Sequence, residues 1–311
     1  MARKKIAIVG GGQIGGILAL IATQKELGNI VLVDIPQKEN LVKGKALDIT
    51  ALRPIDGVDV DLSGSSDFAA IAGADVVIIT AGMPRKPGMT RRELLSVNLK
   101  IIENVAANVK QHAPNAFVVI TTNPVDVISY AFHKLSGLPK QQVVGMAGVL
   151  DSARFCTFIA KETGLSVKDV SGLVIGEHSP NMMPLTGTAT VGGVPLNALL
   201  SQAQIDAVVD RTRNAGTEVV NLYETGSAYF SAASATLDMV DAYLKDRKRV
   251  ISSAALCEGE YGVEGLFLGV PAVIGAGGVE RVLEFDLTEQ EQIRLNETIA
   301  ALKTVVAGVG F

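Results

Sequence analysis

The stretch KIAIVGGGQIG, residues 5–15, decides the fold class. It begins with an apolar run, Lys5 to Val9, that is typical of a strand buried on both faces. A turn of spaced glycines follows, which allows a tight reversal and lets the backbone approach a pyrophosphate closely. The helix expected after the turn would direct free N–H groups and the positive end of its dipole at the phosphates. We therefore expect a dinucleotide site formed by Gly10, Gly11, Gly12, Gln13, Ile14 and Gly15.

A second apolar run, from Asn29 to Ile35, carries Asp34 about twenty residues after the turn, where dinucleotide-binding folds place an acidic residue. A carboxylate there accepts hydrogen bonds from the adenine ribose hydroxyls and repels a 2′-phosphate. The sequence therefore predicts NAD as the cofactor rather than NADP. The alternative is a simple packing turn followed by a solvated aspartate.

The organisation of the chain changes near residue 145. Before it, further apolar runs at 75–80 and 116–122 alternate with helix-like segments at 14–27, 41–52 and 94–111. This order is typical of an α/β, Rossmann-type doubly wound parallel sheet. After it, helices are expected at 149–163, 202–223, 231–245 and from Thr288, with strands at 170–175, 186–191, 194–196, 249–257, 265–268 and 271–274. We expect an NAD-binding domain over 1–145 and an α+β substrate-binding domain over 146–311.

The composition excludes several classes of protein. The 311 residues are 48% hydrophobic and 19% charged, which argues against disorder, and the formal charge of −4 with dispersed cations gives no footprint for nucleic acid. No apolar run approaches the ~20 residues that span a bilayer. The two cysteines, Cys156 and Cys257, show neither metal-ligand nor redox spacing. We expect a cytoplasmic protein without a metal, a membrane segment or a nucleic-acid partner.

A cationic segment, AGMPRKPGMTRR at 81–92, follows the strand that ends near Thr80. It lies outside the carboxyl end of a sheet strand, where open α/β sheets bind their ligands. Arg85 and Arg91 lie six residues apart on this segment and suit an anionic substrate, which a closing loop would cover. The alternative is a solvated surface loop.

Only one of the three histidines is placed where a strand end meets a cleft. His112 and His133 lie near helix ends and are interpreted as solvated or capping residues, whereas His178 follows a buried strand. Asp151 and Arg154, three residues apart on a predicted helix, share one face. They form either a plain ion pair or a site in which Asp151 orients His178 and Arg154 binds a carboxylate. The sequence does not decide whether these residues meet.

Taken together, these residues resemble the lactate/malate dehydrogenase family, and specifically its lactate-dehydrogenase-like bacterial malate dehydrogenases. The resemblance runs from end to end of the chain. Besides the glycine turn and Asp34, it rests on MPRKPGMTR (83–91), TTNP (121–124), VGMAGVLDSARF (144–155), EGEYG (258–262), GVP (269–271) and GAGGVE (275–280).

The resemblance implies a role for each candidate residue. His178 would accept the hydroxyl proton while hydride leaves the same carbon for the nicotinamide, and Asp151 would stabilise the resulting imidazolium. Arg154 would hold the C1 carboxylate of the substrate. Arg91 would polarise the carbonyl with help from Asn123. The cofactor would also contact Asn98, Thr121, Thr122 and Asn123.

Arg85 occupies the position that meets the group beyond the keto carbon in this family, where lactate enzymes typically carry glutamine. Arginine there would pair with a second carboxylate and would be left unpaired by pyruvate. We therefore expect a dicarboxylate substrate, malate or oxaloacetate, and a place in the tricarboxylic acid cycle. Lactate dehydrogenase activity and an NAD-binding protein without catalysis are the alternatives. The resemblance also implies a homo-oligomer, with a tetramer favoured over a dimer.

One segment departs from the family pattern. Around the base the family usually reads Gly-His-Gly-Asp or Glu-His-Gly-Asp, but this chain reads Glu177-His178-Ser179-Pro180-Asn181. Serine replaces a flexible glycine, and proline, which fixes φ and lacks an N–H, replaces an acidic residue. We therefore expect the loop conformation and the charge around His178 to differ from those of the family pattern.

Overall fold

A nine-stranded sheet runs through the whole molecule, in the order β14-β13-β12-β6-β5-β4-β1-β2-β3. The structure, a computed structural model, describes residues 3–83, 91–224 and 226–310, without the side chains of residues 91 and 92. Six strands from the first half pair in parallel. Their order is that of a doubly wound dinucleotide-binding sheet, so the predicted fold class is confirmed. These strands are β1 (Lys5–Val9), β2 (Asn29–Val33), β3 (Leu62–Ser65), β4 (Val76–Ile79), β5 (Phe117–Ile120) and β6 (Val143–Gly145).

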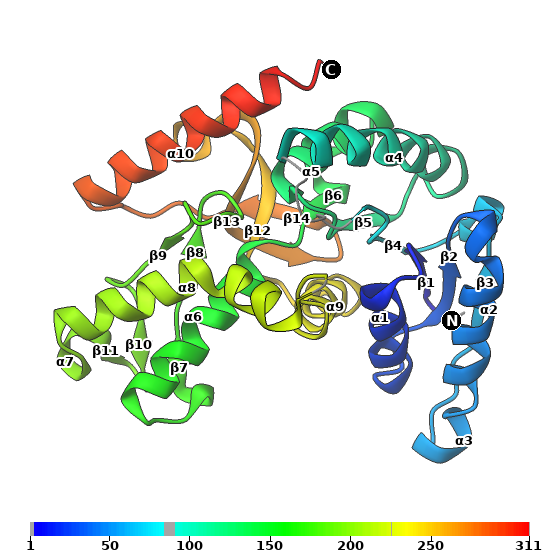
Figure 1. Cartoon of the computed structure of the whole chain (residues 1–311), viewed down its shortest axis with the longest axis horizontal. Helices are drawn as coiled ribbons and strands as arrows, with labels where there is room; N and C mark the ends of the chain where they lie inside the picture. The colour runs from blue at the N-terminus through cyan, green and yellow to red at the C-terminus, as the bar shows by residue number, and fades with distance from the viewer. Residues whose placement is uncertain (1–2, 84–90, 225, 311) are drawn as a thin grey trace.

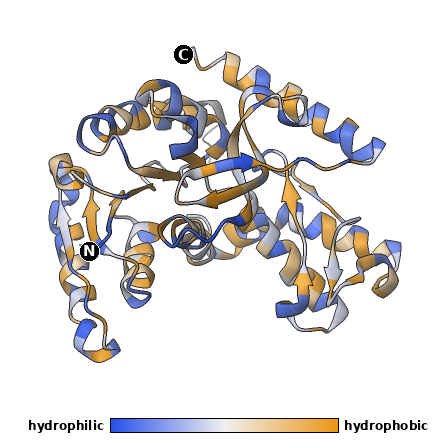
Figure 2. Cartoon of the chain, turned by 180° about the vertical axis from the view of Figure 1, so that it is seen from behind, coloured by the Kyte–Doolittle hydropathy of each residue, from blue (hydrophilic) through white to orange (hydrophobic). Residues whose placement is uncertain are grey.

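Helices cover both faces of this sheet (Figure 1). Helices α1 (Gln13–Gln24) and α9 (Phe230–Leu244) lie on one face, and α4 (Arg91–His112) and α5 (Val125–Ser136) lie on the other. The alternation along β1 explains the two layers, because Ile6 and Ile8 belong to one apolar cluster and Ala7 and Val9 to another. Figure 2 shows the resulting apolar strands inside a more polar set of helices.

The second half of the chain extends the same sheet with three antiparallel strands, β12 (Arg249–Glu258), β13 (Glu264–Gly275) and β14 (Gly278–Val282). Strand β12 pairs with β6 at Ala254 and Gly145. The predicted separate strands at 265–268 and 271–274 are wrong, since β13 runs through Pro271 without a break. Proline has no N–H to donate to a neighbouring strand, but the Pro271 carbonyl accepts a hydrogen bond from the Leu283 N–H at 2.8 Å.

The remaining elements flank this sheet. The helices predicted at 149–163, 202–223 and 231–245 are confirmed, whereas the predicted strand 170–175 is two short strands. No described helix combines the length and the apolarity needed to cross a bilayer. The helices are α2 (Glu39–Thr50), α3 (Arg53–Asp56), α6 (Gly148–Thr163), α7 (Leu196–Leu199), α8 (Gln202–Tyr223) and α10 (Glu289–Ala307), and the strands are β7 (Val170–Ser171), β8 (Val174–Ile175), β9 (Met183–Pro184), β10 (Thr190–Val191) and β11 (Val194–Pro195).

Candidate active site

The glycine turn between β1 and α1 forms a cradle in which side chains are excluded. Gly10 has φ of 109°, and a Cβ there would lie 2.5 Å from the Thr80 hydroxyl. A Cβ on Gly15 would lie 2.0 Å from the Gly10 carbonyl oxygen. At Gly12, the N-cap of α1, a Cβ would meet nothing within 4 Å, and no side chain caps the helix. An open, uncapped helix N-terminus suits a pyrophosphate, so these residues fit a dinucleotide.

Asp34 lies beside this turn at the carboxyl end of β2. One carboxylate oxygen accepts the Gly11 N–H at 2.8 Å, and the other accepts the Ile35 N–H at 2.8 Å. The side chain is 11% exposed. Asp34 therefore fixes the turn and keeps a partly accessible carboxylate next to it, where the ribose of a dinucleotide would lie.

Three of the polar residues predicted to contact the cofactor tie neighbouring strand ends together. Asn98 of α4 is buried, accepts the Met83 N–H at 2.8 Å and donates to the Asn123 carbonyl at 2.9 Å. The hydroxyls of Thr121 and Thr122 donate to the carbonyls of Ile79 and Ala81 at 3.0 and 2.8 Å. The side chain of Asn123 remains exposed at the end of β5.

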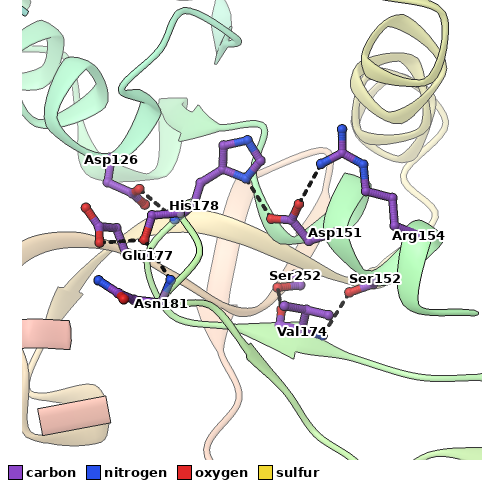
Figure 3. A network of polar contacts seen from close by, with 10 residues as sticks. Asp126, Asp151, Ser152, Arg154, Val174, Glu177, His178, Asn181 and Ser252 are labelled. Atoms are coloured by element: carbon purple, nitrogen blue, oxygen red, sulfur yellow. Dashed lines mark hydrogen bonds and ion pairs between the residues drawn. The ribbon is translucent and has the colours of Figure 1, made fainter. Parts of the chain in front are cut away.

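The structure brings His178, Asp151 and Arg154 together (Figure 3). The Asp151 carboxylate lies between the other two: one oxygen is 2.6 Å from His178 Nδ1, and the other accepts a hydrogen bond from Arg154 Nη1 at 3.2 Å. The side chain of Asp151 is 2% exposed, and those of His178 and Arg154 are 14% and 13% exposed. The His178 ring is thus held by Nδ1, and Nε2 has no hydrogen-bond partner among the described residues, so it can meet a ligand next to a guanidinium that suits a carboxylate.

Strand β8 sets the contact between His178 and Asp151, because it places His178 next to helix α6, which carries Asp151. The Val174 N–H donates to the Ser152 hydroxyl of α6 at 2.9 Å, and the Val174 carbonyl accepts the Ser252 hydroxyl of β12. Gly176 exchanges two backbone hydrogen bonds with Gly269 of β13, at 2.8 and 3.1 Å. The strand that carries the base is therefore fixed on both sides before the chain reaches His178.

Asp126, which sequence reasoning did not single out, lies directly behind the base. It is buried in the first turn of α5, and Oδ2 accepts the backbone N–H of His178 at 3.0 Å. Its Oδ1 is also buried and accepts no hydrogen bond from any residue that the structure describes. Burial raises the pKa of Asp126 to about 7. The nearby Glu177 also raises this pKa, whereas the hydrogen bond from the His178 N–H lowers it. An acidic residue in the first turn of a helix is common for structural reasons, so Asp126 stands out only once its contact with His178 is seen.

The environment of His178 favours its protonated form. Burial lowers the pKa of the imidazole, but the charge and the hydrogen bond of Asp151 outweigh it, and Asp126 adds to them. Arg154 acts in the opposite direction. The net result is a pKa above the ordinary value of histidine, so His178 is suited to take up and release a proton near neutral pH.

The two halves of the chain match two models of one family. Residues 4–145 match the NAD binding domain of lactate/malate dehydrogenase, and residues 148–309 match the α/β C-terminal domain of that enzyme. The chain belongs to the lactate/malate dehydrogenase family. Its cofactor is NAD, as the glycine turn and Asp34 predicted.

Relatives and solved structures within this family carry both names. A malate dehydrogenase of Myxococcus xanthus is 53% identical over 307 residues, which cover 99% of this chain and 98% of the relative. The malate dehydrogenase of Cryptosporidium parvum superimposes with a TM-score of 0.95 at 41% identity, with 99% of each chain covered. A lactate dehydrogenase of the same organism, solved with lactic acid and the NAD cofactor, gives a TM-score of 0.96 at 47% identity and covers 99% of this chain and 98% of its own. The fold alone therefore does not select between the two substrates.

Two predicted substrate contacts fall at the edge of what the structure describes. Arg85 lies outside the described residues. Arg91 is the first residue of α4, and its side chain lies outside them too. The placement of these two arginines over the site therefore remains a prediction.

The segment beside His178 that departs from the family pattern, residues 177–181, forms an ordered turn. The Ser179 hydroxyl donates to the Glu177 carboxylate at 2.8 Å and accepts the Asn181 N–H at 3.1 Å. The Met182 N–H closes the turn on the Ser179 carbonyl at 2.9 Å. The serine that replaces the family's glycine thus supplies hydrogen bonds that hold residues 177–182, and Pro180, which has no N–H, is exposed at the tip.

Proposed function

We propose that the protein is an NAD-dependent malate dehydrogenase, which interconverts (S)-malate and oxaloacetate. The observation that carries this proposal is the single buried carboxylate of Asp151, bonded to both His178 and Arg154. This arrangement places a proton acceptor beside a carboxylate-binding guanidinium in the C-terminal domain of a chain whose N-terminal domain binds NAD. Oxidation of a 2-hydroxy acid requires these two groups at adjacent atoms of the substrate.

Each residue of the site has a separate role in the proposed reaction. Arg154 binds the C1 carboxylate of the substrate and so brings the neighbouring hydroxyl to His178. His178 Nε2 accepts the hydroxyl proton, and the Asp151 carboxylate stabilises the imidazolium that forms. NAD⁺, held by the Gly10–Gly15 turn and Asp34, supplies the hydride acceptor. In the reverse direction the protonated His178 returns the proton to the oxygen.

Two arginines complete the proposed substrate site. Arg91 polarises the keto oxygen together with Asn123, and Arg85 pairs with the second carboxylate, at C4. Pyruvate has a methyl group at that place and would leave the Arg85 charge unpaired in a closed site. The names of the curated relatives, among them a malate dehydrogenase of Bacillus pumilus at 48% identity, support this choice.

The proposal is tested by following the reduction of NAD⁺ with (S)-malate and with (S)-lactate. We expect turnover with malate and a kcat/KM for lactate lower by about a thousandfold or more. Similar values for the two substrates would favour lactate dehydrogenase activity. Fluorescence-detected NADH binding without turnover of either acid would favour a non-catalytic NAD-binding protein.

The raised pKa of His178 predicts opposite pH dependences for the two directions of the reaction. Malate oxidation needs the neutral imidazole, so kcat/KM is expected to fall as the pH drops through the raised pKa of His178. Oxaloacetate reduction needs the imidazolium and is expected to fall as the pH rises through the same value. The midpoint should lie above about 6.5, the ordinary pKa of histidine, and kcat/KM profiles from pH 5 to 9 in both directions measure it.

A variant of Asp126 tests whether the charged groups around the His178 imidazole set this midpoint. Asp151 and Asp126 raise the pKa of His178, and Arg154 lowers it. Asp126→Asn is therefore expected to move the midpoint to lower pH, because it removes one of the two carboxylates and keeps the size of the side chain. A wild-type midpoint at or below 6.5 would contradict this description of the site.

We further propose a homotetrameric protein of the cytoplasm that acts in the tricarboxylic acid cycle. Exposed apolar side chains support an oligomer: Leu47 and Ile55, on α2 and α3, are 74% and 78% exposed, and Leu222, near the end of α8, is 77% exposed. Sedimentation velocity at micromolar concentration should show a single species of about four chains, and a monomer at that concentration would exclude the oligomer. Both cysteines are free, as in a reducing compartment.

A further inference from the structure

Two glycines near the cofactor site, Gly11 in the turn and Gly16 in the first turn of α1, are not required by the backbone conformation. Neither Gly11 nor Gly16 has a positive φ, so their backbone conformations are open to other residues. Both face helix α2. A Cβ on Gly11 would lie 2.2 Å from Val42 Cγ1, and the three heavy atoms nearest to a Cβ on Gly16 are all from Lys45, with Nζ at 3.2 Å and Cδ at 3.3 Å. A side chain at Gly11 would therefore clash with α2, and one at Gly16 would press on the side chain of Lys45.

Lys45 crosses Gly16 to reach the turn. Its ammonium donates to the carbonyl oxygens of Gly11 and Gly12, at 2.8 and 2.7 Å. The Gly12 carbonyl also accepts the Gly16 N–H at 3.1 Å, so one oxygen serves both the helix and Lys45. Val42 and Lys45 lie three residues apart, on one face of α2, and dock this helix on the turn.

The position of this ammonium has an electrostatic consequence. The N–H groups of the turn attract a pyrophosphate, but the two carbonyl oxygens beside them carry partial negative charge and repel it. A cation bonded to both oxygens offsets that repulsion and holds them turned away from the anion. Asp34 and Lys38 are the other charged groups that act on Lys45, one favouring its charge and one opposing it.

We propose that Lys45 is a positioning residue for the dinucleotide: it holds the Gly11 and Gly12 carbonyls in the orientation that pyrophosphate binding needs. Residue 16 is glycine because any larger side chain at this position would displace Lys45. The proposal rests on NAD binding by this domain and does not depend on which 2-hydroxy acid is oxidised.

The first test compares Lys45→Met with Lys43→Met in the full-length protein. Both variants remove one lysine charge from α2, but Lys43 is exposed and pairs with Glu39 at 2.7 Å instead of reaching the turn. We expect the Kd for NADH, measured by fluorescence titration without substrate, to rise about tenfold in Lys45→Met, as for the loss of a charge-assisted contact. It should stay within twofold of wild type in Lys43→Met. Equal Kd values for Lys45→Met and wild type would overturn the proposal.

The second test keeps Lys45 but fills part of the space over Gly16 that its side chain crosses to reach the turn. Alanine is a better helix former than glycine, which offsets the loss of the Lys45 contact, so Gly16→Ala should change the thermal stability of the ligand-free protein little. The Kd for NADH should nevertheless rise several-fold, because the added methyl group displaces the ammonium. In the double variant, Gly16→Ala should add nothing to the effect of Lys45→Met, since the two changes act on one contact. Fully additive effects on the Kd for NADH in the double variant, or a wild-type Kd in Gly16→Ala, would show that the glycine at position 16 is not needed for the contact of Lys45 with the turn.

Discussion

Asp151→Asn is expected to lower kcat for both directions of the reaction by about a thousandfold, within the range for the loss of a general acid–base group. The carboxylate accepts a hydrogen bond from the N–H at His178 Nδ1 and stabilises the imidazolium. An amide at this position can instead donate to Nδ1, which would place the ring proton on Nε2, the nitrogen that must accept the hydroxyl proton. Stopped-flow measurement of single-turnover NADH formation gives the rate of the chemical step.

The double variant shows whether the two residues act as a unit. If Asp151 acts through His178, then Asp151→Asn combined with His178→Asn should be little slower than His178→Asn alone. NADH binding should stay close to wild type in all three variants, because Asp151 and His178 lie outside the glycine turn. A rate for Asp151→Asn within threefold of wild type would remove the role that we assign to this carboxylate.

Arg85→Gln is expected to reverse much of the discrimination between substrates. It removes the charge that we pair with the second carboxylate of oxaloacetate, and it spares pyruvate the cost of leaving that charge unpaired. We expect the ratio of kcat/KM for oxaloacetate over pyruvate to fall by about a thousandfold, through both a loss with oxaloacetate and a gain with pyruvate. Steady-state reduction assays with each keto acid measure both terms.

Lys86→Gln is the matched control for this change, since it removes one positive charge from the adjacent residue. It should change the ratio by less than about fivefold, as expected for a loss of general attraction of anions rather than of a specific pairing. Equal effects of Arg85→Gln and Lys86→Gln would indicate that the net charge of the segment, and not Arg85, selects the substrate.

The sheet was predictable to the extent that its strands are buried on both faces. Strands β4 and β5 consist entirely of buried apolar residues and read as continuous apolar runs. Strand β3, with the sequence LSGS, lies at the edge of the sheet, and β6 is only three residues long. Neither carries a pattern that identifies a strand. Strand β13 contains Pro271, and because proline is uncommon inside sheets the sequence pattern predicts two strands there in place of one.

The site was predictable by residue type and only partly by position. His178 and Asp151 lie 27 residues apart in the chain, and they meet because Ser152 and Ser252 hold β8 between α6 and β12. No periodicity in the sequence encodes that contact. A lysine on an amphipathic helix is usually solvated, so Lys45 gave no signal of its contact with the turn.

The most direct test of the proposed function is a competition in one vessel. Equimolar oxaloacetate and pyruvate are mixed with a limiting amount of NADH and the wild-type protein, and malate and lactate are then separated and quantified. Because the substrates compete for one site, the initial product ratio equals the ratio of their kcat/KM values. We expect malate to exceed lactate by about a thousandfold or more. Comparable amounts of the two products would contradict a site built for a dicarboxylate.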